Sequence, residues 1–322
     1  MKAPLFRLSA IALFTLSGSV RAQGLPLYHA LNPVAESRSG LYFQPYQPRH
    51  SGWAIGTSLN YASAAEINFR DFPSDSAFVM DAEFLRLNAV LTRDLDARNF
   101  VSAEAFAGGS YAGFMDGFLH WYHGLLGISF PERDDRPRNR FDYEVLLPDG
   151  HRIRRAASSL YLGDIRVGIG HRFSDRVQSH LSFTLPTTTA PAGYGRGTLS
   201  ANLITTLRVP LAERLSYEAS LGVGVTPTHG DLSAIQRTLF GSFTSGARLR
   251  LFKEFSAFAN VYFHSPYYQN TGLPALDGHD LSLDFGFLIR DKHGHDWLLG
   301  MTEDPDPSGP AIDLTFRVAK EW

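Results

Sequence analysis

The chain has 322 residues, of which 44% are hydrophobic, 13% aromatic and 19% charged. It contains no cysteine, which excludes disulfide scaffolds, thiolate metal sites and cysteine nucleophiles. The formal net charge is −2 at pH 7 and no basic tail is present, which argues against nucleic acid as a partner. The 29 glycines and the many aromatic residues favour a β-rich protein.

The N-terminus has the organisation of a secretory signal peptide. Lys2 and Arg7 form a positive n-region, residues 8–16 form a short apolar h-region, and Val20-Arg21-Ala22 places small residues at −3 and −1 of a cleavage site. The apolar region is too short to cross about 30 Å of hydrocarbon, so it does not read as a membrane anchor. We expect residues 1–22 to be removed after Ala22, which leaves an exported chain.

Alternation of apolar and polar residues recurs along the rest of the chain, as in 177–185 and 281–290. Segments of nine to eleven residues with this period suit a tilted strand that crosses a bilayer, whereas strands of soluble sandwiches run about five or six residues. No later stretch is apolar for long enough to predict a transmembrane helix. The segments expected to be strands are 53–61, 78–91, 99–111, 160–173, 176–186, 198–209, 214–225, 239–251, 254–264, 280–290, 296–302 and 311–322.

The connections between these twelve segments alternate in length. Short connections lie near 93–98, 174–175, 210–213, 253 and 291–295, and long ones near 62–77, 112–159, 187–197, 226–238, 265–279 and 303–310. Bacterial outer-membrane barrels have this pattern, with short periplasmic turns and long extracellular loops. The sequence therefore predicts an all-β protein, a twelve-stranded antiparallel transmembrane barrel spanning 53–322, in the outer membrane of a Gram-negative bacterium.

The last strand and the aromatic residues fit that prediction. The apolar face of the last strand carries Phe316 and Val318, and the chain stops at Trp322, which is typical of the signal read by the barrel-assembly machinery. Lys320 interrupts this face, but a lysine near the interface can extend its amine to water. Aromatic-girdle positions are expected at Trp53, Tyr61, Tyr217, Trp297 and Trp322.

Charged residues fall on the polar face of the predicted strands. They are Arg86, Arg166, Arg172, Arg208, Arg248, Arg250, Arg290 and Arg317, with Glu104, Asp164, Glu218, Asp284 and Asp313. Charges inside a barrel are either paired with one another or bathed in water, because unpaired burial is unfavourable. Two interpretations stay open: a salt-bridge network that braces a plugged lumen, or a constriction that favours anionic solutes.

Two segments lie outside the predicted wall. Residues 23–52 could fold into the lumen or serve as a tether. In the long loop 112–159, the spacing of the apolar residues predicts a helix over about 114–126, followed by a hairpin around Pro148-Asp149-Gly150. This helix is expected to cap the pore, to lie in the outer leaflet or to stiffen the rim; its marked residues are Phe114, Asp116, Phe118, Trp121 and His123.

Several of these residues form motifs. They are Gly113-Phe-Met-Asp-Gly-Phe-Leu with His123, Pro137-Arg-Asn-Arg-Phe141, Glu303-Asp304 with Pro307, and Asn32-Pro33. Together they resemble a domain-of-unknown-function family of proteobacterial outer-membrane proteins, over nearly the whole mature chain. Leu162-Gly163-Asp164 looks like a weaker match to barrels that transport hydrophobic compounds. The resemblance implies a fold and a location, and it transfers no catalytic residue.

Catalytic and metal-binding patterns are sparse. His264-Ser265, His229 with Asp231, and His279-Asp280 supply parts of a hydrolase site, but no Gly-x-Ser-x-Gly elbow is present. Glu303, Asp304 and Asp306 have the oxygen ligands of a Ca²⁺ site, although solvated loop acids are the simpler interpretation. His293 and His295 are too few to define a transition-metal site. We expect no cofactor.

The sequence thus predicts a monomeric barrel that passes or binds a small solute, amphipathic or anionic. Its expected partners are outer-membrane lipid, lipopolysaccharide and the barrel-assembly machinery. A structural or surface-interaction barrel with a sealed lumen is the alternative, and an outer-membrane acyl hydrolase is a third.

Overall fold

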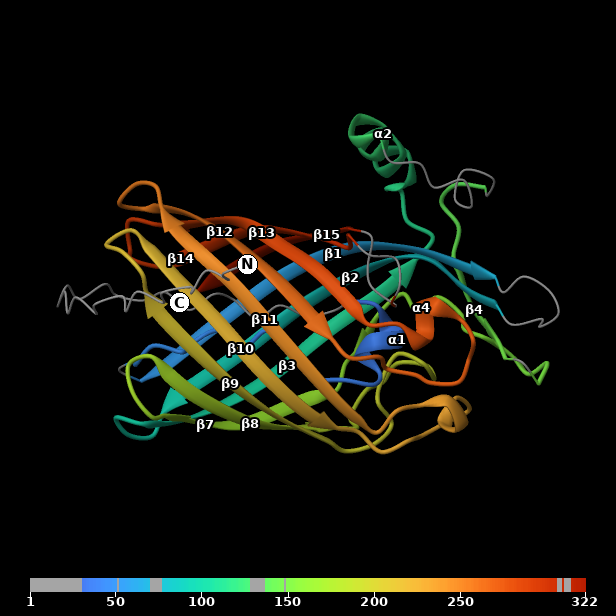
Figure 1. The fold of residues 1–322 in the computed structure, drawn as a ribbon, viewed down its shortest axis with the longest axis horizontal. Coiled ribbons are helices and arrows are strands. Elements are labelled where there is room, and N and C mark those ends of the chain that lie inside the picture. The colour runs from blue at the N-terminus through green and yellow to red at the C-terminus, as the bar shows by residue number, and fades with distance from the viewer. Residues whose placement is uncertain are drawn as a thin grey trace, which may run out of the picture.

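The computed structural model describes residues 31–50, 52–69, 77–127, 137–147, 149–305, 309 and 314–322. Twelve antiparallel strands form a closed barrel, which confirms the predicted fold class (Figure 1). The wall consists of β1 (Trp53–Phe69), β2 (Ala77–Asp94), β3 (Asn99–Tyr111), β7 (Ile165–Arg172), β8 (Val177–Leu185), β9 (Ser200–Pro210), β10 (Leu215–Val225), β11 (Leu239–Arg250), β12 (Phe255–His264), β13 (Asp280–Arg290), β14 (Asp296–Glu303) and β15 (Leu314–Glu321). The short β6 (Tyr161–Leu162) precedes β7 and also pairs with β3.

The first and last strands close the ring. β1 pairs with β15 from Gly56 opposite Glu321 to Ser63 opposite Leu314, and every other wall strand pairs with its neighbours in the chain. Closure leaves no free sheet edge among these strands, so the backbone groups of the wall are satisfied within it.

The two faces of each strand differ as the alternation predicts. In β9, Asn202, Thr206 and Arg208 point into the lumen and are buried, whereas Leu203 and Leu207 point outward and are exposed. An outward row of leucines and valines suits contact with lipid, while the inward row is polar.

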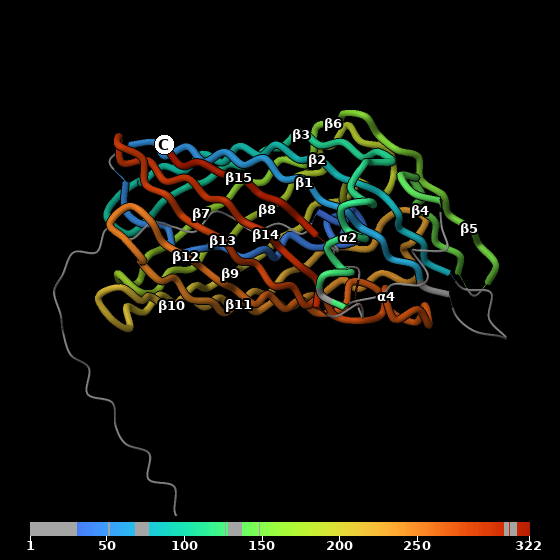
Figure 2. Tube along the Cα trace, turned by 90° about the horizontal axis from the view of Figure 1, so that it is seen from above, coloured from blue at the N-terminus to red at the C-terminus, as the bar shows by residue number. Residues whose placement is uncertain are grey.

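The two ends of the barrel also differ. We call the end with turns 95–98, 173–176, 211–214, 251–254 and 291–295 the turn end, and the opposite end the loop end. The loop end carries α1 (Pro33–Glu36), α2 (Asp116–Leu126), η1 (Ser233–Ile235), α4 (Pro274–Asp277) and the hairpin of β4 (Asp142–Leu146) and β5 (Arg152–Arg154) (Figure 2). Among the described residues, no helix is long and apolar enough to span a membrane.

The first hairpin corrects the predicted boundaries. The expected long loop at 62–77 is mostly strand, because β1 continues to Phe69 and β2 begins at Ala77. The extension of β2 pairs with β4 from Ala77 to Asp81, and β4 pairs with β5. Residues 78–84 are buried on both faces of β2, so the polar alternation that marks the other strands is absent there.

The orientation of the barrel can be tested by tag insertion. If the loop end faces the cell exterior, a tag inserted at Asp149 will be cleaved by protease on intact cells, whereas a tag at Lys253, in an exposed turn at the opposite end, will not. Permeabilised cells serve as the control, because both tags should then be cleaved. Cleavage at Lys253 alone on intact cells would invert the assignment.

Candidate functional site

The lumen is occupied by the chain's own N-terminal segment. Residues 31–50, which we call the plug, run through the barrel from the loop end to the turn end, and most of their side chains are buried. The plug contains one helix, α1, whose first turn is capped by the side chain of Asn32 accepting a hydrogen bond from the Val34 amide at 2.9 Å. Of the two placements expected for 23–52, the described part lies in the lumen.

Hydrogen bonds in both directions join the plug to wall and loop residues near the loop end. The guanidinium of Arg38, itself part of the plug, donates to the carbonyls of Thr226 at 3.0 Å and Arg237 at 2.8 Å. The Tyr262 hydroxyl donates to the Leu41 carbonyl, and Ser39 Oγ lies 2.7 Å from His264 Nε2. Irregular backbone inside a barrel needs such partners, because water cannot supply all of them.

The same arrangement holds toward the turn end. Thr206 donates to the Gln44 carbonyl at 2.6 Å and the Gln178 side chain donates to the Pro45 carbonyl at 2.9 Å. Arg172 Nε donates to the Gln47 carbonyl at 2.9 Å. The plug is therefore held along its whole described length by side chains of the wall.

A charged cluster joins the plug to one sector of the wall. Arg86 pairs with Glu36 of the plug, lies 3.6 Å from Glu104, and stacks its guanidinium 3.6 Å from the centre of the Phe106 ring. Arg166 also lies 3.6 Å from Glu104 and donates to the Gly40 carbonyl at 2.9 Å. Desolvation by burial raises the pKa of Glu36, and the positive charge of Arg86 opposes that rise.

Asp164 lies at the end of this cluster that is nearest the loops. Its carboxylate accepts hydrogen bonds from the backbone amides of Thr187, Thr188 and Arg196, each at 2.9 Å. The Arg196 guanidinium in turn donates to the carbonyls of Glu36 and Ser39. Asp164 therefore orders the 186–199 loop, and that loop holds the plug.

The predicted arginines of the turn end each lie beside an acid. Arg172 is 2.7 Å from Asp94, Arg208 is 3.6 Å from Glu218, Arg250 is 3.1 Å from Glu213, and Arg290 is 3.0 Å from Asp296. Arg248 points to the lumen from the same end. Paired charges brace a lumen more readily than they attract free anions.

The pair of Arg317 with Asp284 crosses a glycine on the strand between them. Arg317 reaches across β14 to Asp284 on β13, with Nη2 2.8 Å from the carboxylate. Gly300 lies between them, and the guanidinium occupies the space beside its Cα, 3.3 Å from where a Cβ would be. Asp313, the other acid expected in the lumen, lies outside the described residues.

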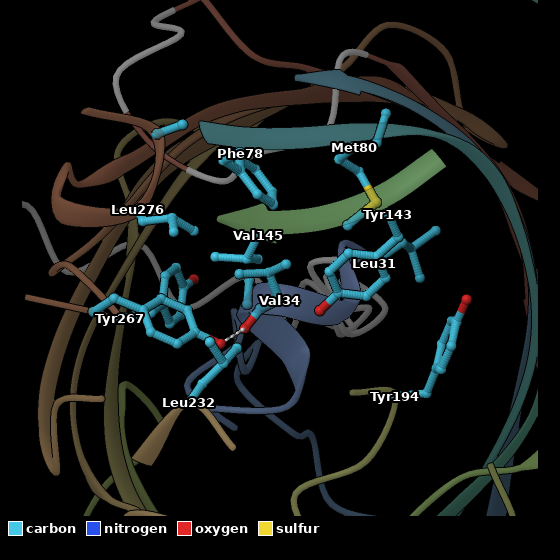
Figure 3. Packing of buried hydrophobic residues seen from close by; sticks show 14 of the residues in the cluster. Leu31, Val34, Phe78, Met80, Tyr143, Val145, Tyr194, Leu232, Tyr267 and Leu276 are labelled. Atoms are coloured by element: carbon cyan, nitrogen blue, oxygen red, sulfur yellow. Dashed lines mark hydrogen bonds between the residues drawn. The ribbon is translucent and has the colours of Figure 1, made fainter. Parts of the chain in front are cut away.

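The loop end of the lumen is filled by an apolar core. Leu31 and Val34 of the plug pack with Phe78 and Met80 of β2, and with residues of the β4–β5 hairpin and the loops (Figure 3). The other labelled members are Tyr143, Val145, Tyr194, Leu232, Tyr267 and Leu276. This packing closes the barrel at the loop end in the structure.

The turn-end half of the lumen contains a cavity of about 980 Å³, a volume that includes its opening. It lies between the plug and the wall, and its lining combines polar and apolar groups: Gln44, Gln47, Ser58, Asn88, Thr92, Ser102 and His180 with Val90, Phe100, Leu288 and Leu298. A second cavity, of about 330 Å³, lies further toward the loops beside Glu36, Tyr42 and Arg196. Glu104 and Arg166 line both cavities, so this pair separates them.

Helix α2 lies on the outer surface of the wall and not across the mouth. Its Phe118 ring is 6.0 Å from Phe316 and Phe114 stacks on Tyr61 at 5.4 Å. Both Phe316 and Tyr61 face outward, opposite each other in the β1–β15 register. Of the three placements left open for this helix, the structure does not show the one across the mouth, because the apolar residues of α2 contact the outward faces of β1 and β15.

The predicted assembly residues lie at the same seam. Phe316 and Val318 face outward, and the Trp322 amide donates to the Ile55 carbonyl at 2.8 Å. The Lys320 amine lies 3.6 Å from the centre of the Trp322 ring and 3.6 Å from Asp291, at the turn end. Lys320 therefore extends along the wall to the water boundary, as a lysine on an apolar face can.

Serine–histidine pairs occur, but not those expected from the sequence. Ser102 Oγ lies 2.8 Å from His180 Nε2, in the lining of the large cavity. The other imidazole nitrogen of His180 is buried without a hydrogen-bond partner in the described structure, so no carboxylate orients the ring as in a hydrolase triad. His229 and Asp231 are instead engaged with Gln236 and Arg155 in the loops. Ser102 lies on β3 and His180 on β8, so their proximity follows from the strand register and could not be predicted from the sequence.

The weak metal candidates are not assembled in the part of the chain that the structure describes. No group of three His, Cys, Asp or Glu residues there is arranged to hold a metal ion. Glu303 lies 3.8 Å from His123 of α2, and Asp306 lies outside the described residues.

The closed ring, its outward apolar row and its polar, plugged lumen define an outer-membrane β-barrel protein. The profile of DUF3187, a protein family of unknown function, matches residues 50–304. The chain belongs to this family, which confirms the resemblance seen in its motifs. No curated protein matches the chain.

Solved structures agree with the class. The chain is similar to the COG4313 outer membrane channel from Pseudomonas putida F1, with a TM-score of 0.54 at 11% identity over 86% of this chain and 97% of the other. It also matches the NanC porin, with a TM-score of 0.46 at 8% identity over 83% and 98% of the two chains. The Pseudomonas putida toluene transporter TodX matches with a TM-score of 0.43 at 9% identity over 85% and 89%. At 11% identity the likeness to the first of these structures extends to the fold alone.

Proposed function

We propose that this protein is a passive channel or binding barrel for small solutes, held closed by the plug. The observation that carries the proposal is the cavity between the plug and the wall, in the turn-end half of the lumen. A barrel that served only as a scaffold would have no need for a solute-sized space inside, since interiors otherwise pack densely.

The lining, in which charges of both signs accompany neutral polar and apolar groups, favours an amphipathic solute. Amides and hydroxyls such as those of Gln44, Asn88 and Ser102 offer hydrogen bonds, while Phe100 and Leu298 offer apolar contact. The lumenal arginines named above lie beside acids, which argues against a dedicated anion constriction. A solute that crossed the barrel would pass the Glu104–Arg166 pair between the two cavities.

A reversible lock on the plug tests this proposal. The Cγ of Leu41 lies 3.1 Å from the position of a Cβ at Gly224, close to the roughly 3 Å between a Cβ and the far sulfur of a disulfide. The side-chain oxygen of Asn202 lies closer still to that position and must turn aside in the variant. Because the chain has no cysteine, the variant Leu41→Cys/Gly224→Cys would form a single defined crosslink between plug and wall.

In planar bilayers, the oxidised variant should give no openings, and reduction should restore the openings of the unmodified protein. The single variants Leu41→Cys and Gly224→Cys are the controls, because oxidant should leave both unaffected. Conduction by the oxidised form would show that the plug need not move. If the unmodified and reduced proteins never conduct, the barrel is sealed.

The sealed, structural barrel is the second candidate, and the apolar core at the loop end favours it. That core contains side chains from the plug, from β2 and from three loops, and such packing resists opening. The same conductance traces decide between the two candidates.

A further inference from the structure

Helix α2 packs on the barrel mainly through one of its faces, and the rings of Phe114 and Phe118 add contacts with Tyr61 and Phe316. Met115 and Leu119 are buried against Leu314, and Tyr61 and Met301 of the wall pack around them. His123, one turn further along, lies 3.8 Å from Glu303 at the loop-end tip of β14. This wall-facing side accounts for the position of the helix on the barrel.

A second face of α2 carries a ridge of large apolar side chains. Phe114, Phe118, Trp121 and Leu125 recur at intervals of three and four residues, so they share one side of the helix. Trp121 is 58% exposed and Leu125 66% exposed. The exposed side away from the ridge carries His120 and two glycines, Gly117 and Gly124, which makes the helix amphipathic across the part that the wall does not cover. Asp116 is buried and accepts a hydrogen bond from the Asn139 amide.

The strand register fixes the direction in which the ridge points. β15 runs from Leu314 at the loop end toward Trp322 at the turn end, so Phe316 lies deeper along the wall than Leu314. The ridge residue Phe118 contacts Phe316, whereas Leu119 contacts Leu314 and His123 approaches Glu303 at the rim. The ridge therefore faces the middle of the barrel wall, and the polar side faces away from it.

We infer that α2 is an interfacial membrane helix whose ridge inserts among the acyl chains of the outer leaflet. The apolar surface of the ridge is continuous with the outward row of the barrel through Phe316 and Val318, which is already the lipid-facing surface of this fold. An amphipathic helix with tryptophan and phenylalanine on one side and polar groups on the other lies in the plane of such an interface. Because the ridge continues the lipid-facing surface of the barrel, we expect acyl chains to cover it.

Two spin-labelled variants test the inference. Leu125→Cys places a nitroxide on the ridge and His120→Cys places one on the polar side, with no other cysteine in the chain. In phosphatidylcholine vesicles, the label at 125 should collide more often with oxygen, which concentrates in hydrocarbon, than with a water-soluble nickel chelate. The label at 120 should show the reverse preference.

Both positions lie on the exposed surface of α2, and persistence of the SDS-resistant folded form at low temperature verifies that each variant has kept its barrel. Equal or nickel-dominated accessibility at 125 would overturn the inference, as would protection of 125 from both reagents, which would indicate a protein contact. The result does not depend on whether the barrel conducts.

Discussion

Replacing Arg86 with methionine is expected to lower the free energy of unfolding by about 3–5 kcal/mol, the usual effect of removing one partner from a buried ion pair. Arg86 pairs with Glu36 and approaches Glu104, and its guanidinium lies against Phe106. Methionine preserves much of the volume but leaves Glu36 in a buried position without its closest cation. The transition temperature of the SDS-resistant barrel measures the loss.

The effect of Arg86→Met should depend on pH in a defined direction. Burial already raises the pKa of Glu36, and the variant removes the charge that opposes this rise. A carboxyl group whose pKa is higher in the folded state stabilises the fold at low pH, and that contribution disappears as the pH rises through the folded-state pKa. The variant should therefore be closer to the unmodified protein at pH 5 than at pH 8.

The double variant Glu36→Gln/Arg86→Met is the matched control. An uncharged glutamine does not require the cation, so the double variant should recover much of the loss seen in Arg86→Met alone. Equal destabilisation in the single and double variants would show that Arg86 acts through Glu104 or Phe106 instead.

Deleting residues 31–50 should produce a folded barrel with a stable open conductance. No residue of the described plug belongs to a strand of the sheet, so the ladder that closes the barrel does not use the plug. The charged side chains left in the lumen would be hydrated in the widened pore, which removes the penalty of burial. Single-channel recordings, compared with those of the full chain, measure the change.

The deletion should also loosen the loop end. Leu31, Val34 and Leu41 contribute to the apolar core, so the 226–238 and 265–279 loops would lose packing partners and become sensitive to protease. A folded but non-conducting deletion would show that these loops seal the barrel by themselves. Loss of the SDS-resistant form would show that the plug is needed for the wall to form.

The wall could be predicted from sequence because each strand repeats a simple pattern. From β8 to β14 the predicted ends lie within one or two residues of those in the structure, since apolar lipid-facing residues alternate with mostly polar lumen-facing residues along each strand. β1 and β2 were predicted too short. Beyond Tyr61, β1 reads Ala-Ser-Ala-Ala, which has little contrast between its faces, and β2 is buried on both sides.

The plug and the ion pairs could be predicted only in part. Residues 31–50 have no periodicity, and the groups that hold them lie far away in sequence, such as Thr226, 188 residues after Arg38. The alternation of apolar and polar residues predicts which arginines point inward. Their acidic partners depend on the register of neighbouring strands, as in the pair of Arg317 with Asp284, which spans Gly300. The helical spacing in α2 predicted an amphipathic helix without indicating which surface it would contact.

The course of the plug constrains the order of assembly. The plug precedes β1 in the chain, yet it is gripped by Thr206, Tyr262 and other residues of strands that are made much later. β15, the last strand, completes the ring by joining β1. A segment at the beginning of the chain can already be in place when these two strands meet, so the sheet can curl around it. The same segment at the other end of the chain would have to enter a finished ring.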